Sequence, residues 1–197
     1  MANPSRPDFW TKRYHSGETP WDLGHPPAAL LDWIARTPAR GKVLIPGVGS
    51  GHEIPVFAEA RWDVTAIDMS PAAIEIARAK LNGDAPPVSL ICGDFFSIPF
   101  EFRTFDAVYE RTFLCALHPA RWNRLVARTA ALLKPGGLIV GHYFFGETDD
   151  GPPYGLPLGE ERTLFDQEFE LLEDTPATDS LPLFEGRERW QVRRRRD

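Results

Sequence analysis

The 197-residue sequence contains few sulfur-bearing residues, with two cysteines and two methionines. Cys92 and Cys115 stand in apolar surroundings, and two thiols are too few for a disulfide framework or a zinc site. We therefore expect both cysteines to be buried and reduced. We also expect no metal site and a cytoplasmic protein.

Long apolar runs and an excess of positive charge are also missing. No stretch approaches the roughly 20 apolar residues of a membrane span, and residues 1–10 lack the apolar core of a signal peptide. The formal net charge of −6 repels polyanions. We therefore expect no membrane and no nucleic-acid partner, and we expect the basic run at 193–196 to be solvated.

Short apolar runs alternate with helical patterns from Lys42 onward. Runs of strand length occupy 42–46, 63–68, 88–94, 105–110 and 137–145. Helical patterns occupy 28–36, 52–60, a stretch beginning at Pro71, 119–133 and 159–168. Two further strands, at 169–174 and 187–195, follow them. This alternation predicts an α/β fold: a doubly wound, mostly parallel seven-stranded sheet with an antiparallel C-terminal hairpin.

The sequence shows no linker between two cores. Ser70 followed by Pro71 predicts a helix start, and the Lys-Pro-Gly-Gly stretch at 134–137 predicts a helix stop. We expect a single domain over 1–197, with 1–40 as an N-terminal cap or lid and 41–197 as the core.

A glycine-rich loop follows the first predicted strand. Gly47, Gly49 and Gly51 are spaced G-x-G-x-G and lead directly into a helical pattern. Glycine suits a backbone that turns sharply and that a ligand approaches closely. The pattern also fits a tight turn without a ligand, and it does not match the G-x-G-x-x-G spacing of nicotinamide-binding enzymes.

Acidic residues end the next two strands. Asp68, 17 residues after Gly51, can accept hydrogen bonds from both hydroxyls of a ribose, although it can also cap the helix at Pro71, where Ser70 is the better cap. Asp94 can accept from the amine of an adenine, and Phe95 can pack against the base. Phe96 we assign to the core. Together with the glycine loop, these residues describe an adenosine site without a phosphate-binding lysine.

At this point the chain resembles the thiopurine and thiol methyltransferase family, which includes the plant halide/thiol methyltransferases. The resemblance spans most of the chain and rests on FWTKRYHSGETPWDLGHP, LIPGVGSGHE, VTAIDMS, CGDFF, YERTFLCALHPARW, LLKPGG and GPPY. It implies a Rossmann-like class I methyltransferase that uses S-adenosyl-L-methionine to methylate the sulfur of a small thiol. The sequence departs from the family at 47–49, where Gly-Val-Gly replaces the commoner Leu-Cys-Gly.

The resemblance also implies roles for individual residues. Trp10 and Trp21 would line and close the cofactor site, Gly47 would touch the methionine part, and Asp68 would hold the ribose. Arg111 matches an arginine near cofactor and acceptor, where the halide branch tends to have tyrosine, which favours an organic thiol. The full set expected to bind the cofactor is Trp10, Trp21, Gly47, Gly49, Gly51, Asp68, Met69, Asp94, Phe95, Glu110 and Arg111.

Methyl transfer to sulfur needs alignment and a thiolate more than it needs acid–base catalysis. A cation such as Arg111 would favour the thiolate by lowering the pKa of the thiol. Glu110, Tyr14 and His15 are candidates for a general base, with Glu110 alternatively forming an ion pair that orients Arg111. His118, before a helix start, we expect to act as a cap.

The acceptor is left open by the sequence. Residues 143–145 and the Gly-Pro-Pro-Tyr stretch at 151–154 are expected to border it, which favours an apolar, aromatic or heteroaromatic thiol, with the protein a monomer or weak dimer. Two alternatives keep the cofactor: methylation of halide, selenium or tellurium species, and a non-catalytic sensor of S-adenosylmethionine. A third alternative, a nicotinamide-dependent oxidoreductase, is disfavoured because the sequence contains no convincing proton-transfer pair.

Overall fold

A computed structural model of the protein describes residues 3–37, 41–81, 88–148 and 150–197. The chain divides into two compact units, residues 1–98 and 99–197. The prediction of a single domain over 1–197 stays a prediction.

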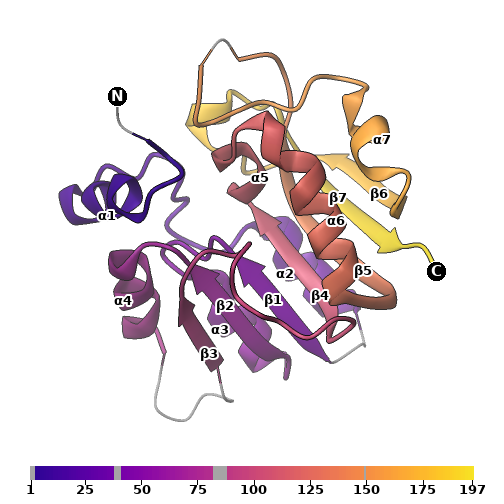
Figure 1. Ribbon diagram of the computed structural model, residues 1–197, viewed down its shortest axis with the longest axis horizontal. Coiled ribbons are helices and arrows are strands. Elements are labelled where there is room, and N and C mark those ends of the chain that lie inside the picture. The colour runs from indigo at the N-terminus through magenta and orange to yellow at the C-terminus, as the bar shows by residue number, and fades with distance from the viewer. Residues whose placement is uncertain (1–2, 38–40, 82–87, 149) are drawn as a thin grey trace. The chain divides into compact units, whose positions relative to one another are not determined.

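The first unit contains three parallel strands in the order β3-β2-β1 (Figure 1). Its elements are α1 (Pro7–Ser16), α2 (Ala28–Arg36), β1 (Lys42–Pro46), α3 (Glu53–Glu59), β2 (Asp63–Asp68), α4 (Pro71–Ala79) and β3 (Val88–Cys92). Pro46 pairs with Ile67, and Asp68 pairs with Cys92. The carboxyl ends of all three strands therefore meet at one edge.

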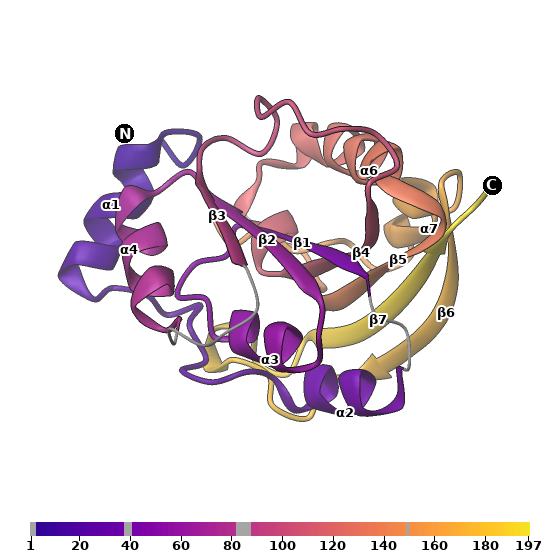
Figure 2. The same ribbon diagram turned by 90° about the horizontal axis from the view of Figure 1, so that it is seen from below.

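Helices cover these strands because β1 and β2 carry apolar side chains on both faces. Trp33 of α2 packs against Phe57 of α3 and against Trp62, with ring centroids 6.4 and 5.9 Å apart. Figure 2 shows α2 beside α3, and α1 beside α4.

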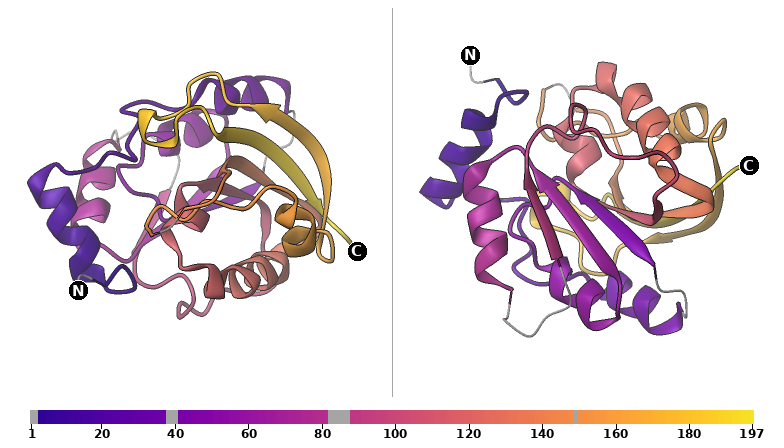
Figure 3. Two further views of the ribbon diagram at one scale, coloured as in Figure 1. Left: turned by 90° about the horizontal axis from the view of Figure 1, so that it is seen from above. Right: turned by 60° about the horizontal axis from the view of Figure 1, so that its bottom comes forward.

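The second unit contains four strands in the order β4-β5-β7-β6. Its elements are β4 (Phe105–Arg111), α5 (Phe113–Ala116), the 3-10 helix η1 (Pro119–Arg121), α6 (Trp122–Leu132), β5 (Leu133–Phe144), α7 (Glu160–Phe165), β6 (Phe169–Pro176), the 3-10 helix η2 (Pro182–Phe184) and β7 (Glu188–Arg195). β4 and β5 are parallel, whereas β7 runs antiparallel to both β5 and β6. Figure 3 shows the two last strands, in orange and yellow, side by side.

These elements confirm the predicted α/β class, the seven mostly parallel strands and the antiparallel C-terminal hairpin. The helix after Ser70 begins as predicted, with Ser70 Oγ accepting from the backbone N–H of Ala73. The helix predicted over 119–133 is divided into η1 and α6, and it ends at Leu132, before the Lys-Pro-Gly-Gly stretch. α1 was not predicted, although Pro7 at its start and Gly17 after its end are ordinary helix boundaries.

Two predictions about exposure are wrong. Cys92, at the end of the edge strand β3, is exposed, whereas Cys115 is buried as expected. The C-terminal basic run is not uniformly solvated, because it is part of β7 and successive side chains point to opposite faces. Arg193 is fully buried: it donates to Gln191 Oε1, and its guanidinium lies 4.3 Å from the centroid of the Phe165 ring.

No helix among the described residues is long and apolar enough to cross a membrane.

Candidate functional site

The glycine loop connects β1 to α3 with left-handed backbone at Gly47, Gly49 and Gly51. A Cβ atom on Gly51 would lie 2.8 Å from Ala77 Cβ, and one on Gly49 would lie 2.9 Å from the hydroxyl oxygen of Tyr14. The positive φ angles and these close approaches explain why glycine stands here, and they confirm the expected sharp turn.

Asp68 ties the loop to the next helix. Its Oδ2 atom accepts from the backbone N–H of Gly49 at 3.1 Å, and its Oδ1 atom accepts from the backbone N–H of Ser70 at 2.8 Å. Burial raises the pKa of Asp68, and the backbone donors work against that rise. Because Ser70 supplies the helix cap, the carboxylate of Asp68 serves the junction between loop and helix.

An aromatic cluster from the N-terminal segment lies over the loop. Trp21 Nε1 donates to the Tyr14 hydroxyl at 3.2 Å, and the rings of Trp10 and Trp21 stand edge to face with centroids 5.4 Å apart. Thr11 Oγ1 lies 2.9 Å from Ser70 Oγ, which joins α1 to the start of α4. Burial is the main cause that raises the pKa of Tyr14 well above its ordinary value, and the negative charge of Asp68 is the second. A phenol rather than a phenolate therefore stands beside Gly49. His15 is exposed on α1.

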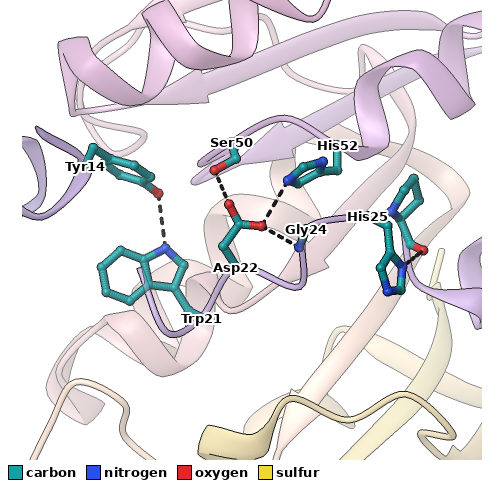
Figure 4. A network of polar contacts seen from close by, with 8 residues as sticks. Tyr14, Trp21, Asp22, Gly24, His25, Ser50 and His52 are labelled. Carbon is teal, nitrogen blue, oxygen red and sulfur yellow. Dashed lines mark hydrogen bonds and ion pairs between the residues drawn. The ribbon is translucent and has the colours of Figure 1, made fainter. Parts of the chain in front are cut away.

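Asp22 connects the segment after α1 to the glycine loop (Figure 4). Its Oδ1 atom accepts from the backbone N–H of Gly24 at 2.8 Å and lies 3.0 Å from His52 Nε2. Ser50 Oγ donates to its Oδ2 atom. The pKa of Asp22 is lowered overall. Burial alone would raise it, but the hydrogen bonds from Ser50 and Gly24, together with His52, outweigh burial. Sequence reasoning missed this network, because nothing near Asp22 in the sequence indicates that Ser50 and His52 are its partners.

The pKa of His52 is also lowered, chiefly by burial, which outweighs the attraction of Asp22. The pair is therefore a carboxylate with a neutral imidazole at neutral pH, held by a hydrogen bond.

The end of β3 lies next to Asp68, since the backbone N–H of Gly93 donates to the carbonyl of Asp68 at 2.8 Å. Asp94 Oδ1 accepts from the backbone N–H of Phe96, and its Oδ2 accepts from Ser97 Oγ. Phe95 and Phe96 are both buried with their rings edge to face, and burial of Phe96 is the core position expected. The structure thus brings the glycine loop, Asp68, Met69, Asp94 and Phe95 to one edge of the first unit.

Glu110 and Arg111 end β4 in the second unit. Glu110 Oε1 accepts from the backbone N–H groups of Phe113 and Leu114 at 2.9 and 3.0 Å, so this carboxylate caps α5. Burial raises the pKa of Glu110 to about 7. The expected alternative, an ion pair from Glu110 to Arg111, is not formed: Arg111 Nη1 lies 3.5 Å from Glu188 Oε1.

Glu188, at the start of β7, was missed by sequence reasoning. Its Oε2 atom accepts from Ser180 Oγ at 2.9 Å and from the backbone N–H of Leu181 at 2.8 Å. The side chains of Glu188 and Arg111, which form the ion pair, are both buried. His118 is an exposed cap of η1, as predicted, with Nδ1 accepting from the backbone N–H of Ala120.

The sequence profile of thiopurine S-methyltransferases matches residues 5–197. The chain belongs to this family. A probable thiol methyltransferase 2 of Arabidopsis thaliana is 32% identical over 169 residues, which are 83% of this chain and 74% of the relative. Thiocyanate methyltransferase 1 of the same plant is 28% identical over 192 residues, covering 92% of this chain and 83% of the relative.

The fold is the Rossmann-like class I methyltransferase fold. The 1,6-didemethyltoxoflavin-N1-methyltransferase of Burkholderia thailandensis, solved with bound S-adenosylhomocysteine, matches with a TM-score of 0.74 and 22% identity over 96% of this chain and 87% of its own. As a member of the thiopurine S-methyltransferase family, the protein is an S-adenosylmethionine-dependent S-methyltransferase, as the motif resemblance predicted.

The chemistry of two residues in the first unit is compatible with this cofactor. Gly49 has no side chain to stand between the loop backbone and the Tyr14 hydroxyl, and Asp68 presents a buried carboxylate at the adjoining strand end. Within the ranges that the structure describes, no group of three or more His, Cys, Asp or Glu side chains could hold a metal ion.

Proposed function

We propose that the protein methylates the sulfur of a small aromatic or heteroaromatic thiol. The observation that carries this proposal is the guanidinium of Arg111, which is buried at the carboxyl end of a parallel strand in a family of sulfur methyltransferases. Although Glu188 lies 3.5 Å from Nη1, neither Nη1 nor Nη2 of Arg111 has a hydrogen-bond partner within the described part of the chain, so both can donate to an anionic sulfur and stabilise it.

The residues of the first unit would hold the cofactor. S-Adenosylmethionine supplies a methyl group on a positively charged sulfonium, which is already a good leaving group. The backbone of the loop at Gly47, Gly49 and Gly51 would contact the cofactor. Asp68 and Met69, which lie beside this loop, would bind the ribose. Asp94 and Phe95 are the proposed contacts to the adenine. Their places at the ends of β1, β2 and β3 support this assignment.

The N-terminal segment acts as a lid. Trp10 and Trp21 cover the cofactor and exclude water, which strengthens electrostatic interactions and aligns the reactants. The contacts from Tyr14 to Trp21 and from Asp22 to Ser50 hold this segment on the loop.

The acceptor reacts as a thiolate that Arg111 stabilises. Aromatic thiols are acidic enough to ionise without a base, so the general-base role of Glu110 or Tyr14 is an additional proposal. Between the two, Glu110 has the pKa closer to neutrality, and Tyr14 stays protonated.

A second candidate acceptor is a small inorganic anion. The Arabidopsis relative named for thiocyanate supports this possibility. Halide, selenium and tellurium species belong to the same chemical class of soft anions. A non-catalytic sensor would bind the cofactor and turn over none of them.

The test is formation of S-adenosylhomocysteine with a panel of aromatic thiols, alkyl thiols, hydrosulfide, thiocyanate, iodide and a phenol control. We expect selective turnover of aromatic thiols, and loss of that turnover in Arg111→Ala. Preference for thiocyanate or iodide would support the second candidate. Calorimetric cofactor binding without any turnover would instead support the sensor, and an unchanged rate in Arg111→Ala would contradict the role of Arg111.

A further inference from the structure

Three polar side chains lie in register across β4, β5 and β7. Arg111 pairs with His142 of β5, and His142 pairs with Trp190 of β7. Directly paired residues on neighbouring strands point to the same face of a sheet. The rings of His142 and Trp190 are in contact, with centroids 5.2 Å apart. The order of these strands can be followed in Figure 2.

This row of side chains is buried without hydrogen bonds. Arg111, His142 and Trp190 are 9%, 2% and 2% exposed. Within the part of the chain that the structure describes, Nη1 and Nη2 of Arg111, both ring nitrogens of His142 and Nε1 of Trp190 have no hydrogen-bond partner. Buried polar atoms are nearly always paired, and leaving them unpaired costs free energy. Several such nitrogens side by side indicate a place where a ligand supplies the missing partners.

The charges in this row limit the chemistry of the ligand. Glu188 balances Arg111 through the 3.5 Å contact, and Ser180 and Leu181 occupy its other oxygen. Burial, followed by the charge of Arg111, lowers the pKa of His142 to about 3, so its imidazole is neutral and offers one donor and one acceptor. The free groups are thus mainly N–H donors without a large net charge.

The neighbouring surface is aromatic. Phe144 lies two residues after His142 on β5, so it shares the same face. Its ring packs against Phe184 with centroids 4.5 Å apart. Polar donors next to an aromatic surface suit a planar ring that carries hydrogen-bond acceptors.

We infer that His142 and Trp190 are specificity-determining residues that, together with Arg111, bind the ring nitrogens of a heteroaromatic acceptor. This inference rests on the proposed thiol methylation and extends it to two residues outside the sequence motifs that carry the family resemblance.

The experiment compares pyridine-2-thiol with benzenethiol, which has the same ring size without the nitrogen. Turnover is measured with the full-length enzyme at saturating S-adenosylmethionine, and thiol binding is measured by calorimetry with S-adenosylhomocysteine present. The variants are Trp190→Phe, which removes the N–H donor and keeps an aromatic ring, His142→Leu, and the conservative His142→Asn. Trp122→Phe is the matched control, because Trp122 Nε1 already donates to the carbonyls of Leu114 and Leu117.

We expect Trp190→Phe and His142→Leu each to lower kcat/KM for pyridine-2-thiol about 5-fold to 10-fold, mainly through KM. Benzenethiol should change by less than about 2-fold, and His142→Asn should recover part of the loss. Trp122→Phe should lower stability and leave the ratio of the two substrates unchanged.

Equal losses for both thiols, or no loss for either, would overturn the inference and assign the two residues to packing alone. If the wild type binds thiols but methylates neither, the proposed function fails. A preference for pyridine-2-thiol in binding that Trp190→Phe removes would still support this inference in that case.

Discussion

Nε2 of His52 lies 3.0 Å from Oδ1 of Asp22, and this contact joins the segment after α1 to the residue that follows the glycine loop. Ser50, inside the loop, donates to the other oxygen of the same carboxylate. One side chain of the proposed lid therefore holds both the loop and the start of α3. The position of Trp21, next in sequence to Asp22, depends on these contacts.

Asp22→Asn should weaken binding of S-adenosylhomocysteine about 10-fold, since the amide NH₂ replaces one of the two accepting oxygens, so Ser50 and His52 can no longer both donate to this side chain. Calorimetric titration measures this directly. Asp32→Asn, an exposed position on α2, is the matched control and should bind as the wild type does. An Asp22→Asn variant with unchanged affinity would show that the lid does not depend on this carboxylate.

Gly49→Ala should disrupt the same region from the loop side. The added Cβ would lie 2.9 Å from the Tyr14 hydroxyl, in a backbone with φ of +55°. Gly136→Ala is the control for backbone strain alone, because Gly136 has φ of +72° and nothing within 4 Å of the added atom. Both variants should lose roughly 1–2 kcal/mol of stability. Only Gly49→Ala should lose cofactor affinity, by more than about 10-fold in calorimetry, and equal affinity in the two variants would contradict the proposed contact between the glycine loop and the cofactor.

Arg111→Met should destabilise the protein by about 3 kcal/mol, because it leaves the Glu188 carboxylate buried without its cation. The double variant Arg111→Met/Glu188→Gln should regain most of that stability in urea unfolding. Thiol turnover should be lost in both. Restored turnover in the double variant would mean that Arg111 acts on stability and not on the acceptor.

Glu110→Gln should change how stability depends on pH. The folded pKa of Glu110 is about 7, above the unfolded value of 4.5, so its contribution is fully present below pH 4.5 and is lost as pH rises through 7. Between pH 5 and 8 the wild type should lose about 2 kcal/mol relative to Glu110→Gln, as measured by unfolding at each pH.

The same variant tests the general-base proposal for Glu110. Glutamine keeps an oxygen that accepts from Phe113 and Leu114, so α5 should remain capped. Retained thiol turnover with an unshifted pH profile would remove Glu110 from the chemistry and leave it as a cap. Loss of the limb of the pH profile near 7 would instead support proton transfer.

Local patterns predicted most of the elements in this protein. The apolar runs of β1, β2 and β4, the Ser70–Pro71 helix start and the hairpin of β6 and β7 are readable because propensity, burial and capping act over a few residues. The same local patterns identified the glycine loop and the acidic residues that end β2 and β3. The parallel arrangement then brought them together, because every β–α–β unit returns its strand end to the same edge.

Exposure was harder to predict than position. Cys92 stands among apolar residues in the sequence, but it is exposed because it lies on the edge strand of the first unit. Arg193 is basic, but it is buried because it faces the covered side of β7. In both cases the side chain's surroundings depend on strands that are distant in the sequence. α1 was missed because its helical signal is weak outside its two ends.

The sequence by itself determined most of the strand and helix pattern, the glycine loop, the acidic strand ends and the family, because these features depend on residues close together in the chain. Tertiary structure alone decided that Asp22 bonds Ser50 and His52, that Glu110 caps α5, and that Arg111 pairs with Glu188 and shares a face with His142 and Trp190. Most of these partners are distant in the sequence, so the path of the folded chain decides which of them meet. For Arg111, His142 and Trp190 strand register decides it, because a one-residue change in register would point each side chain to the other face.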